Sequence, residues 1–222
     1  MMIKRILSLL WGLFLFALGI VLTVQSNLGT APWDVLHLGL TNYLPLTLGQ
    51  VSQLTGILVI GVSWFLGVKP GWGSFANMYF IGLFIDIIMA VGWIPMMHHW
   101  LLQLALLFMG IWLIGWATFF YLSAAFGAGP RDSLMVAVVR KIGWPVWKIR
   151  TILETSVTAI GYFLGGPVGV GTIIIAFTLG PSIQWAFSIM GKRAQDINHD
   201  PLIFRERKSA VNDKPEQHSE TT

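Results

Sequence analysis

Long runs of apolar residues follow one another along most of the chain, and short segments rich in Gly, Pro and Trp separate them. Six of these runs are long enough to cross about 30 Å of hydrocarbon as helices. They lie at residues 6–24, 50–68, 74–93, 100–122, 149–166 and 171–190. The pattern therefore predicts an all-α fold, a polytopic bundle of about six transmembrane helices.

The second half of the chain repeats the first at an offset of 98 residues, without a gap. The matches fall on residues that fix backbone geometry, and the aligned pairs include Gly12 and Gly110, Gly29 and Gly127, Pro32 and Pro130, Asp34 and Asp132, and Gly73 and Gly171. We interpret residues 1–97 as a first three-helix repeat and residues 98–194 as a second. Residues 195–222 are polar and mixed in charge, which is typical of a disordered extension, here on the cytoplasmic side.

Each repeat holds an odd number of spans, so the second copy is expected to enter the membrane from the opposite side. The segments 25–49, 94–99 and 167–170 contain no Lys or Arg, whereas the alternate connections carry them all. Arg131 and Arg150 are counted here among the cationic anchors of the inner face. The positive-inside rule then predicts a 3+3 inverted repeat in a bacterial inner membrane, with both termini cytoplasmic. A fourth span in each copy, which would make the copies parallel, fits this distribution less well.

A Gly-x-x-Pro-x-Asp motif occurs once in each repeat, at residues 29–34 and 127–132. Gly permits a tight turn, Pro suits the first position of a helix, and Asp in the first turn faces the positive end of the helix dipole. The apolar stretches that follow, 32–43 and 130–142, reach only about 18 Å as helices. We therefore predict two short broken or re-entrant helices packed between the spans.

Inverted repeats with broken helices are typical of transporters, where half-helix N-termini converge near the membrane midplane. The candidate residues for binding a substrate or ion are Asp34, Asp132, Asp86, Gly29, Pro32, Gly127 and Pro130. The two motif carboxylates could bind a cation or proton, or leave backbone N–H groups for an anion. Alternatively, each one only caps its short helix.

Two further acidic residues lie inside predicted spans. Asp86 interrupts the run 74–93, and an acid at such depth faces protein or water, in either a functional or a structural role. Glu154 follows Arg150 by four residues, the spacing of an ion pair on one helix face. We expect this pair to be structural, with a role in transport as the alternative.

Composition narrows the class of protein further. Hydrophobic residues make up 55% of the chain and charged residues 11%, against about a quarter charged in soluble domains, so the lipid bilayer is the expected partner. The net charge of +4 reflects the membrane anchors and does not indicate nucleic acid. Cysteine is absent, which excludes disulfides and thiol chemistry. No phosphate-binding loop, nucleophile elbow or His-Glu-x-x-His motif occurs, so we expect no catalytic residue, no cofactor, no metal site and no enzymatic activity.

The motif segments resemble the YczE/YyaS family of bacterial inner-membrane proteins and, more distantly, the YitT family. The resemblance covers about residues 5–190, and its carriers are Leu28-Gly29-Thr30-Ala31-Pro32-Trp33-Asp34, Phe126-Gly127-Ala128-Gly129-Pro130-Arg131-Asp132, Tyr162-Phe163-Leu164-Gly165-Gly166 and Gly169-Val170-Gly171-Thr172. It implies a multi-span plasma-membrane protein and supplies neither a substrate nor catalytic residues.

Three functions are consistent with these features. The leading hypothesis is a small transporter or permease-like protein for an unknown solute or ion, with a pseudo-twofold site near the paired motifs. The alternative is a non-transporting accessory or regulatory protein that scaffolds a membrane partner, and a membrane-embedded enzyme acting on lipid comes third. A homodimer is also consistent with the sequence, because a protein of six spans is small for a membrane protein.

Overall fold

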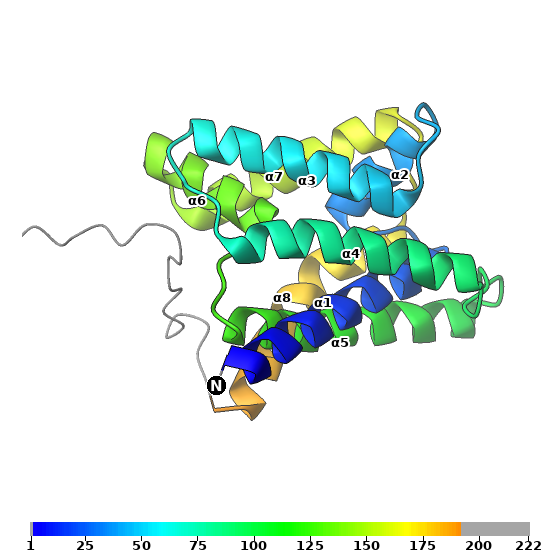
Figure 1. Ribbon diagram of the computed structural model, residues 1–222. Helices are drawn as coiled ribbons and strands as arrows, with labels where there is room; N and C mark the ends of the chain where they lie inside the picture. The colour runs from blue at the N-terminus through cyan, green and yellow to red at the C-terminus, as the bar shows by residue number, and fades with distance from the viewer. Residues whose placement is uncertain (1, 192–222) are drawn as a thin grey trace, which may run out of the picture.

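The computed structural model describes residues 2–191, which form eight α-helices and no strand (Figure 1). Six helices are long: α1 (Met2–Gln25), α3 (Leu48–Phe65), α4 (Trp72–Val91), α5 (Trp100–Ser123), α7 (Val146–Phe163) and α8 (Val170–Ile189). Two are short: α2 (Pro32–Thr41) and α6 (Pro130–Ile142). The predicted all-α class is confirmed, and each long helix overlaps one predicted apolar run. The predicted tail, 195–222, lies outside the described residues.

Five of the long helices, namely α1, α3, α4, α5 and α8, are long and apolar enough to cross a membrane. The exception is α7, whose first half carries Lys148, Arg150 and Glu154 on a helix of 18 residues. The structure thus supports a multi-pass membrane protein. A sixth crossing, by α7, stays a prediction of the sequence.

Both short helices begin at the proline of the repeated motif. Pro32 and Pro130 stand in the first turn, where a missing N–H breaks no helical hydrogen bond. Gly29 has a φ of 99° and Gly127 a φ of 118°, a left-handed backbone that residues with a Cβ rarely adopt. The motif therefore ends the preceding connection and starts a helix by local geometry alone.

The backbone of the first half recurs in the second. Helices α1, α3 and α4 begin and end at positions that align, 98 residues on, with the bounds of α5, α7 and α8. The loops match as well: the N–H of Gly73 donates to the carbonyl oxygen of Phe126 at 2.8 Å, and the N–H of Gly171 donates to that of Leu28 at 2.7 Å. Gly73 aligns with Gly171, and Leu28 aligns with Phe126. The start of the last long helix in each half therefore binds the motif loop of the other half through the same hydrogen bond.

Helices α1 and α5 lie side by side and antiparallel, flanked by α4 and α8 (Figure 1). At one end Arg5 Nε donates to the carbonyl oxygen of Ala124 at 3.0 Å. At the other, the N–H of Met97 donates to the carbonyl oxygen of Gln25 at 2.9 Å. Between them a Cβ on Gly19 would lie 2.9 Å from a backbone oxygen of α5, so small residues let the two backbones approach.

The remaining four helices form a second layer, at the top of Figure 1. In it α2 packs against α7 and α6 packs against α3, so each short helix lies against a long helix of the other half. The layers are joined where α4 packs against α3 and α6. Because the short helices cross between halves, their N-terminal ends are brought into the interior of the bundle.

Candidate functional site

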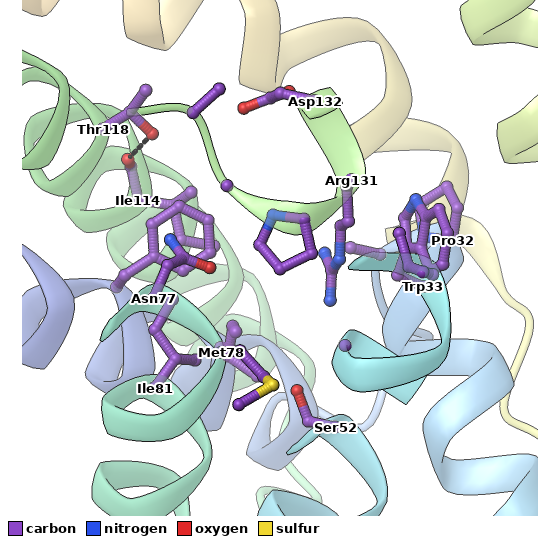
Figure 2. Close-up of a pocket in the computed structure, with 18 of the residues that line it drawn as sticks. Pro32, Trp33, Ser52, Asn77, Met78, Ile81, Ile114, Thr118, Arg131 and Asp132 are labelled. Atoms are coloured by element: carbon purple, nitrogen blue, oxygen red, sulfur yellow. Dashed lines mark hydrogen bonds between the residues drawn. The ribbon is translucent and has the colours of Figure 1, made fainter. Parts of the chain in front are cut away.

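A cavity of about 420 Å³ lies inside the bundle, and side chains from all eight helices line it. The first turns of α2 and α6 both reach its wall, α2 through Pro32 and Trp33 and α6 through Pro130 and Arg131. Figure 2 shows Arg131 beside Trp33 and Pro32. A volume of this size falls within the range of about 300–1,000 Å³ that small-molecule sites occupy. The two repeated motifs therefore meet at one cavity of ligand size.

The wall combines an apolar majority with a small set of polar groups. Its apolar side chains include Phe16, Ile20, Val59, Met78, Ile81, Ile114, Met135, Leu179 and Ile183. Its polar and charged side chains are His37, Ser52, Asn77, Thr55, Thr118, Tyr121, Arg131, Asp132, Arg150 and Glu154. Such a wall fits a small molecule with an apolar body, positioned by a few polar contacts.

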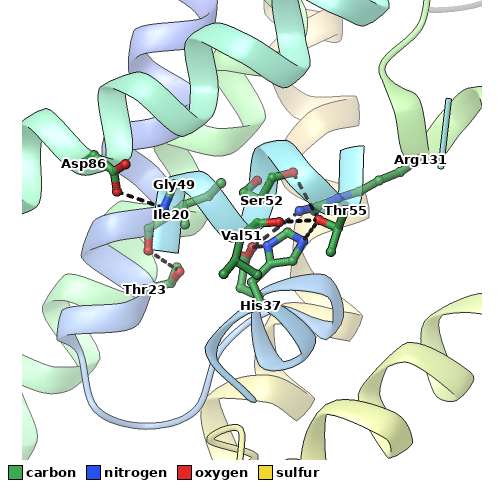
Figure 3. Close-up of polar contacts among 10 residues, drawn as sticks. Ile20, Thr23, His37, Gly49, Val51, Ser52, Thr55, Asp86 and Arg131 are labelled. Atoms are coloured by element: carbon green, nitrogen blue, oxygen red, sulfur yellow. Dashed lines mark hydrogen bonds and ion pairs between the residues drawn. The ribbon is translucent and has the colours of Figure 1, made fainter. Parts of the chain in front are cut away.

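Asp34 lies directly behind this wall and is 2% exposed. One of its oxygens, Oδ1, is 3.5 Å from His37 Nδ1 and 3.4 Å from Arg131 Nη2. On the far side of the imidazole, His37 Nε2 is 2.8 Å from Thr55 Oγ1. Figure 3 shows His37, Thr55 and Arg131 turned toward one another. Because a buried carboxylate is stable only when paired, these groups form one unit, which we call the Asp34 cluster: Asp34, His37, Thr55 and Arg131.

Arg131 links the Asp34 cluster to the cavity. Its guanidinium carbon lies 5.2 Å from the ring centroid of Trp33, and its side chain is 34% exposed. A guanidinium carries five N–H donors, and among the described residues Arg131 uses one of them, toward Asp34. The remaining donors are available to a ligand in the cavity.

Asp132, the aligned partner of Asp34, has a different environment. It lines the cavity itself, and Tyr121 donates its hydroxyl to Asp132 Oδ2 at 3.0 Å. Neither Asp34 nor Asp132 accepts a hydrogen bond from a backbone N–H among the described residues, so both carboxylates contact side chains instead of capping a helix. The first N–H groups of α2 and α6 are therefore left without a side-chain cap.

The structure does not bring Asp86 to the cavity. Its carboxylate accepts a hydrogen bond from Thr47 Oγ1 at 2.6 Å and another from the N–H of Gly49 at 2.9 Å. Asp86 thus binds the first turn of α3 from the neighbouring α4. Because these bonds hold two helices together, they give Asp86 a structural contact away from the other two acids.

The remaining sequence candidates take several positions. Arg150 Nε donates to Glu154 Oε1 at 2.9 Å, the geometry expected from their i,i+4 spacing, and both side chains line the cavity. Gly29 and Gly127 form the turns behind the short helices and do not line it. Among residues 2–191, no three His, Asp or Glu side chains are placed to hold a metal ion.

The sequence pattern indicated Arg131 and Arg150 as anchors of the inner face and did not place Arg131 at a site. Both side chains line the cavity while they stay partly exposed, Arg131 by 34% and Arg150 by 51%. His37 was also missed, although its i,i+3 spacing from Asp34 places both on one helix face. Thr55 reaches His37 only because α3 packs against α2, and no sequence pattern signals that contact.

The chain is similar over most of its length to several known proteins. A model of the "Family of unknown function (DUF6198)" matches residues 3–188. The "Uncharacterized membrane protein YczE" of Bacillus subtilis is 35% identical over 215 residues, covering 90% of this chain and 99% of the relative. An "Uncharacterized protein" of Haemophilus influenzae is 34% identical over 189 residues, covering 85% and 86%.

The more distant "Uncharacterized protein YyaS" of Bacillus subtilis is 29% identical over 165 residues, covering 73% of this chain and 82% of the relative. No solved structure matches the chain significantly. The resemblance noted from the sequence motifs is thus confirmed by matches over most of the chain. The protein is a multi-pass membrane protein that belongs to the DUF6198 family, together with relatives named YczE and YyaS.

Proposed function

We propose that this protein is a small transporter in which a solute binds in the central cavity and leaves to either side of the membrane. The observation that carries the proposal is the cavity itself, which all eight helices line and in which the two short helices begin. A scaffold needs packed helices but no interior site of ligand size. Convergence of two half-buried helix starts on one cavity is the arrangement expected of inverted-repeat transporters.

The inverted repeat belongs to the same proposal. The aligned helices α1 and α5 lie antiparallel. The hydrogen bond that Gly73 of the first half makes to the second half is repeated by Gly171 of the second half to the first. Both features support a twofold axis in the membrane plane, with one copy upside down relative to the other. The distribution of Lys and Arg then favours an inner membrane location with cytoplasmic termini.

A difference between the halves suggests how the cavity opens. In the first half α3 packs against α4, whereas the aligned α7 and α8 barely touch. A second cavity of about 670 Å³ lies between α7 and α8, and it shares Pro32 and Glu154 with the central cavity. If α7 and α8 came together while α3 and α4 separated, the cavity would close toward one side of the membrane and open toward the other. Such a change is alternating access.

Labelling with cysteine tests both parts of the proposal, because the natural chain contains no cysteine. Tyr43→Cys and Lys141→Cys alter aligned, exposed positions. We expect a membrane-impermeant maleimide to reach them from opposite sides in sealed vesicles of known orientation. Labelling of both from one side would contradict the inverted repeat.

Ser52→Cys tests transport, because Ser52 lines the central cavity. A transporter should expose this position to each side in turn, so right-side-out and inverted vesicles should both be labelled. Crosslinking across the α7–α8 gap, through Thr155→Cys and Ala176→Cys, should then restrict labelling to one side. Labelling from one side alone in the uncrosslinked protein would favour the accessory function.

A further inference from the structure

The Asp34 cluster points to a specific class of substrate. Building on the transport function proposed above, we propose that the central cavity binds a small organic carboxylate together with one proton. In this proposal Arg131 binds the carboxylate, and His37, held between Asp34 and Thr55, carries the proton.

Arg131 is placed to bind an anion in the cavity. Its guanidinium carbon lies 5.2 Å from the ring centroid of Trp33, within the range of a cation–π contact, and a guanidinium can bind a carboxylate through two parallel N–H donors. Its contact with Asp34 is a single long one, 3.4 Å from Nη2 to Oδ1. A ligand carboxylate can therefore take the unused donors at the cavity face. The uncapped N-termini of α2 and α6 add positive potential at the same wall.

The contacts of Thr55 allow the cluster two proton arrangements. Thr55 Oγ1 lies 2.8 Å from His37 Nε2, 2.9 Å from the carbonyl oxygen of Val51 and 3.0 Å from that of Ser52. A hydroxyl has one hydrogen to donate. If Thr55 donates it to a carbonyl oxygen, His37 must donate from Nε2. If Thr55 donates it to His37, Nε2 carries no hydrogen.

The second nitrogen of the imidazole faces Asp34, and this decides the proton count. With Nε2 donating, His37 Nδ1 needs a hydrogen of its own to pair with Asp34 Oδ1 at 3.5 Å, so the ring is a cation. With Thr55 donating, Nδ1–H alone satisfies the carboxylate and the ring is neutral. The two arrangements differ by one proton, and rotation of the Thr55 hydroxyl interconverts their hydrogen bonds.

Anion and proton are coupled because Arg131 and His37 face the same oxygen of Asp34. When a carboxylate draws Arg131 toward the cavity, Asp34 loses part of its positive partner. A proton from cavity water, taken up by His37, restores the balance of charge at this buried carboxylate. Linkage requires the converse as well, so protonation of His37 strengthens binding of the carboxylate by the same factor.

Other charged groups near His37 are already paired. Helix α3 contributes no charged side chain to this wall. From α7, Arg150 and Glu154 bind each other, and from α6, Asp132 binds Tyr121. Arg131 is therefore the charged group whose pairing a ligand changes most readily. The apolar side chains of the wall, among them Phe16, Met78 and Ile114, favour a carboxylate with an apolar body.

Three probes with one apolar body and different head groups test the proposal: benzoate, benzyl alcohol and benzylamine. The full chain is purified, placed in lipid nanodiscs, and titrated calorimetrically at several pH values. We expect benzoate to bind with uptake of one proton, whereas the alcohol and the amine bind at least about tenfold more weakly. Above the range in which His37 titrates, benzoate affinity should fall about tenfold for each pH unit.

Substitutions separate the two roles. Arg131→Gln should lower benzoate affinity at least about tenfold, while His37→Gln should keep binding but remove the proton uptake and its pH dependence. Arg140→Gln, at the exposed end of the same helix, removes an equal charge and should change neither.

Equal binding of the three probes, binding of none, or unchanged benzoate affinity in Arg131→Gln would overturn the carboxylate assignment. Proton uptake that persists in His37→Gln would overturn the proton assignment. Each of these failures leaves the labelling of Ser52→Cys to decide transport independently. Conversely, linked binding of benzoate and a proton without alternating access would refute transport and keep the site.

Discussion

The two halves of this protein share a backbone and differ in how their last two helices meet. In the first half a Cβ on Gly82 would lie 2.5 Å from the carbonyl oxygen of Gly49, so α3 and α4 touch backbone to backbone. In the second, no described heavy atom lies within 4 Å of a Cβ on the aligned Gly180. The aligned glycines Gly82 and Gly180 thus differ: Gly82 lies at a tight helix contact, and Gly180 faces open space.

The halves also differ in the chemistry that they bring to the cavity. His37 and Thr55, which hold Asp34, align with Met135 and Leu153, which cannot bind a proton. Asp132 therefore has no equivalent of the Asp34 cluster. The comparison teaches that the two halves kept the same helix starts, whereas a few side chains closed the α3–α4 contact, left α7 and α8 apart, and placed an imidazole beside only one of the two aligned acids.

The largest effect is expected where the backbones touch. Gly82→Val adds two methyl groups and a Cβ against the backbone of α3, which must shift, so we expect a loss of about 3 kcal/mol in the free energy of unfolding. Gly180→Val meets open space and should cost less than about 1 kcal/mol. Unfolding in mixed detergent micelles measures both. Equal losses would show that α7 and α8 also touch in the membrane.

A smaller difference is expected between the aligned acids. Asp34→Asn leaves Arg131 and His37 without their shared anion, and we expect a loss of about 2 kcal/mol, less than for a fully buried pair because Arg131 is partly exposed. Asp132→Asn keeps an acceptor for Tyr121 and should cost at most about 1 kcal/mol. The same unfolding assay compares them. A reversed order would mean that Asp132 is the more deeply paired acid.

The smallest difference concerns Asp86 and the aligned Gln184. Asp86→Asn weakens two charge-assisted hydrogen bonds to the start of α3, and we expect a loss of about 1 kcal/mol. Gln184→Asn removes no hydrogen bond among the described residues and should stay within about 0.5 kcal/mol. Hydrogen exchange at the first turn of α3 gives a second readout. Unaltered exchange there in Asp86→Asn would show that Thr47 and Gly49 are held by other contacts.

Sequence alone determined the features that arise locally. Apolar runs set the long helices, Pro32 and Pro130 set the starts of the short ones, and Gly29 and Gly127 set the turns before them. The 98-residue offset carried these features into both halves, since aligned Gly and Pro residues constrain the same dihedral angles wherever they occur. A proline or glycine needs no distant partner to act, and its effect is therefore visible in the sequence.

Tertiary structure alone decided which side chains share the cavity. Arg131 binds Asp34, and Thr55 binds His37, because α6 packs against α3 and α2 lies between α3 and α7. Asp86 does not join Asp34 and Asp132 for the same reason, since α4 places it beside the start of α3. Such contacts join residues from separate helices, and helix-to-helix packing is set by the fit of whole surfaces, which no spacing along the chain encodes.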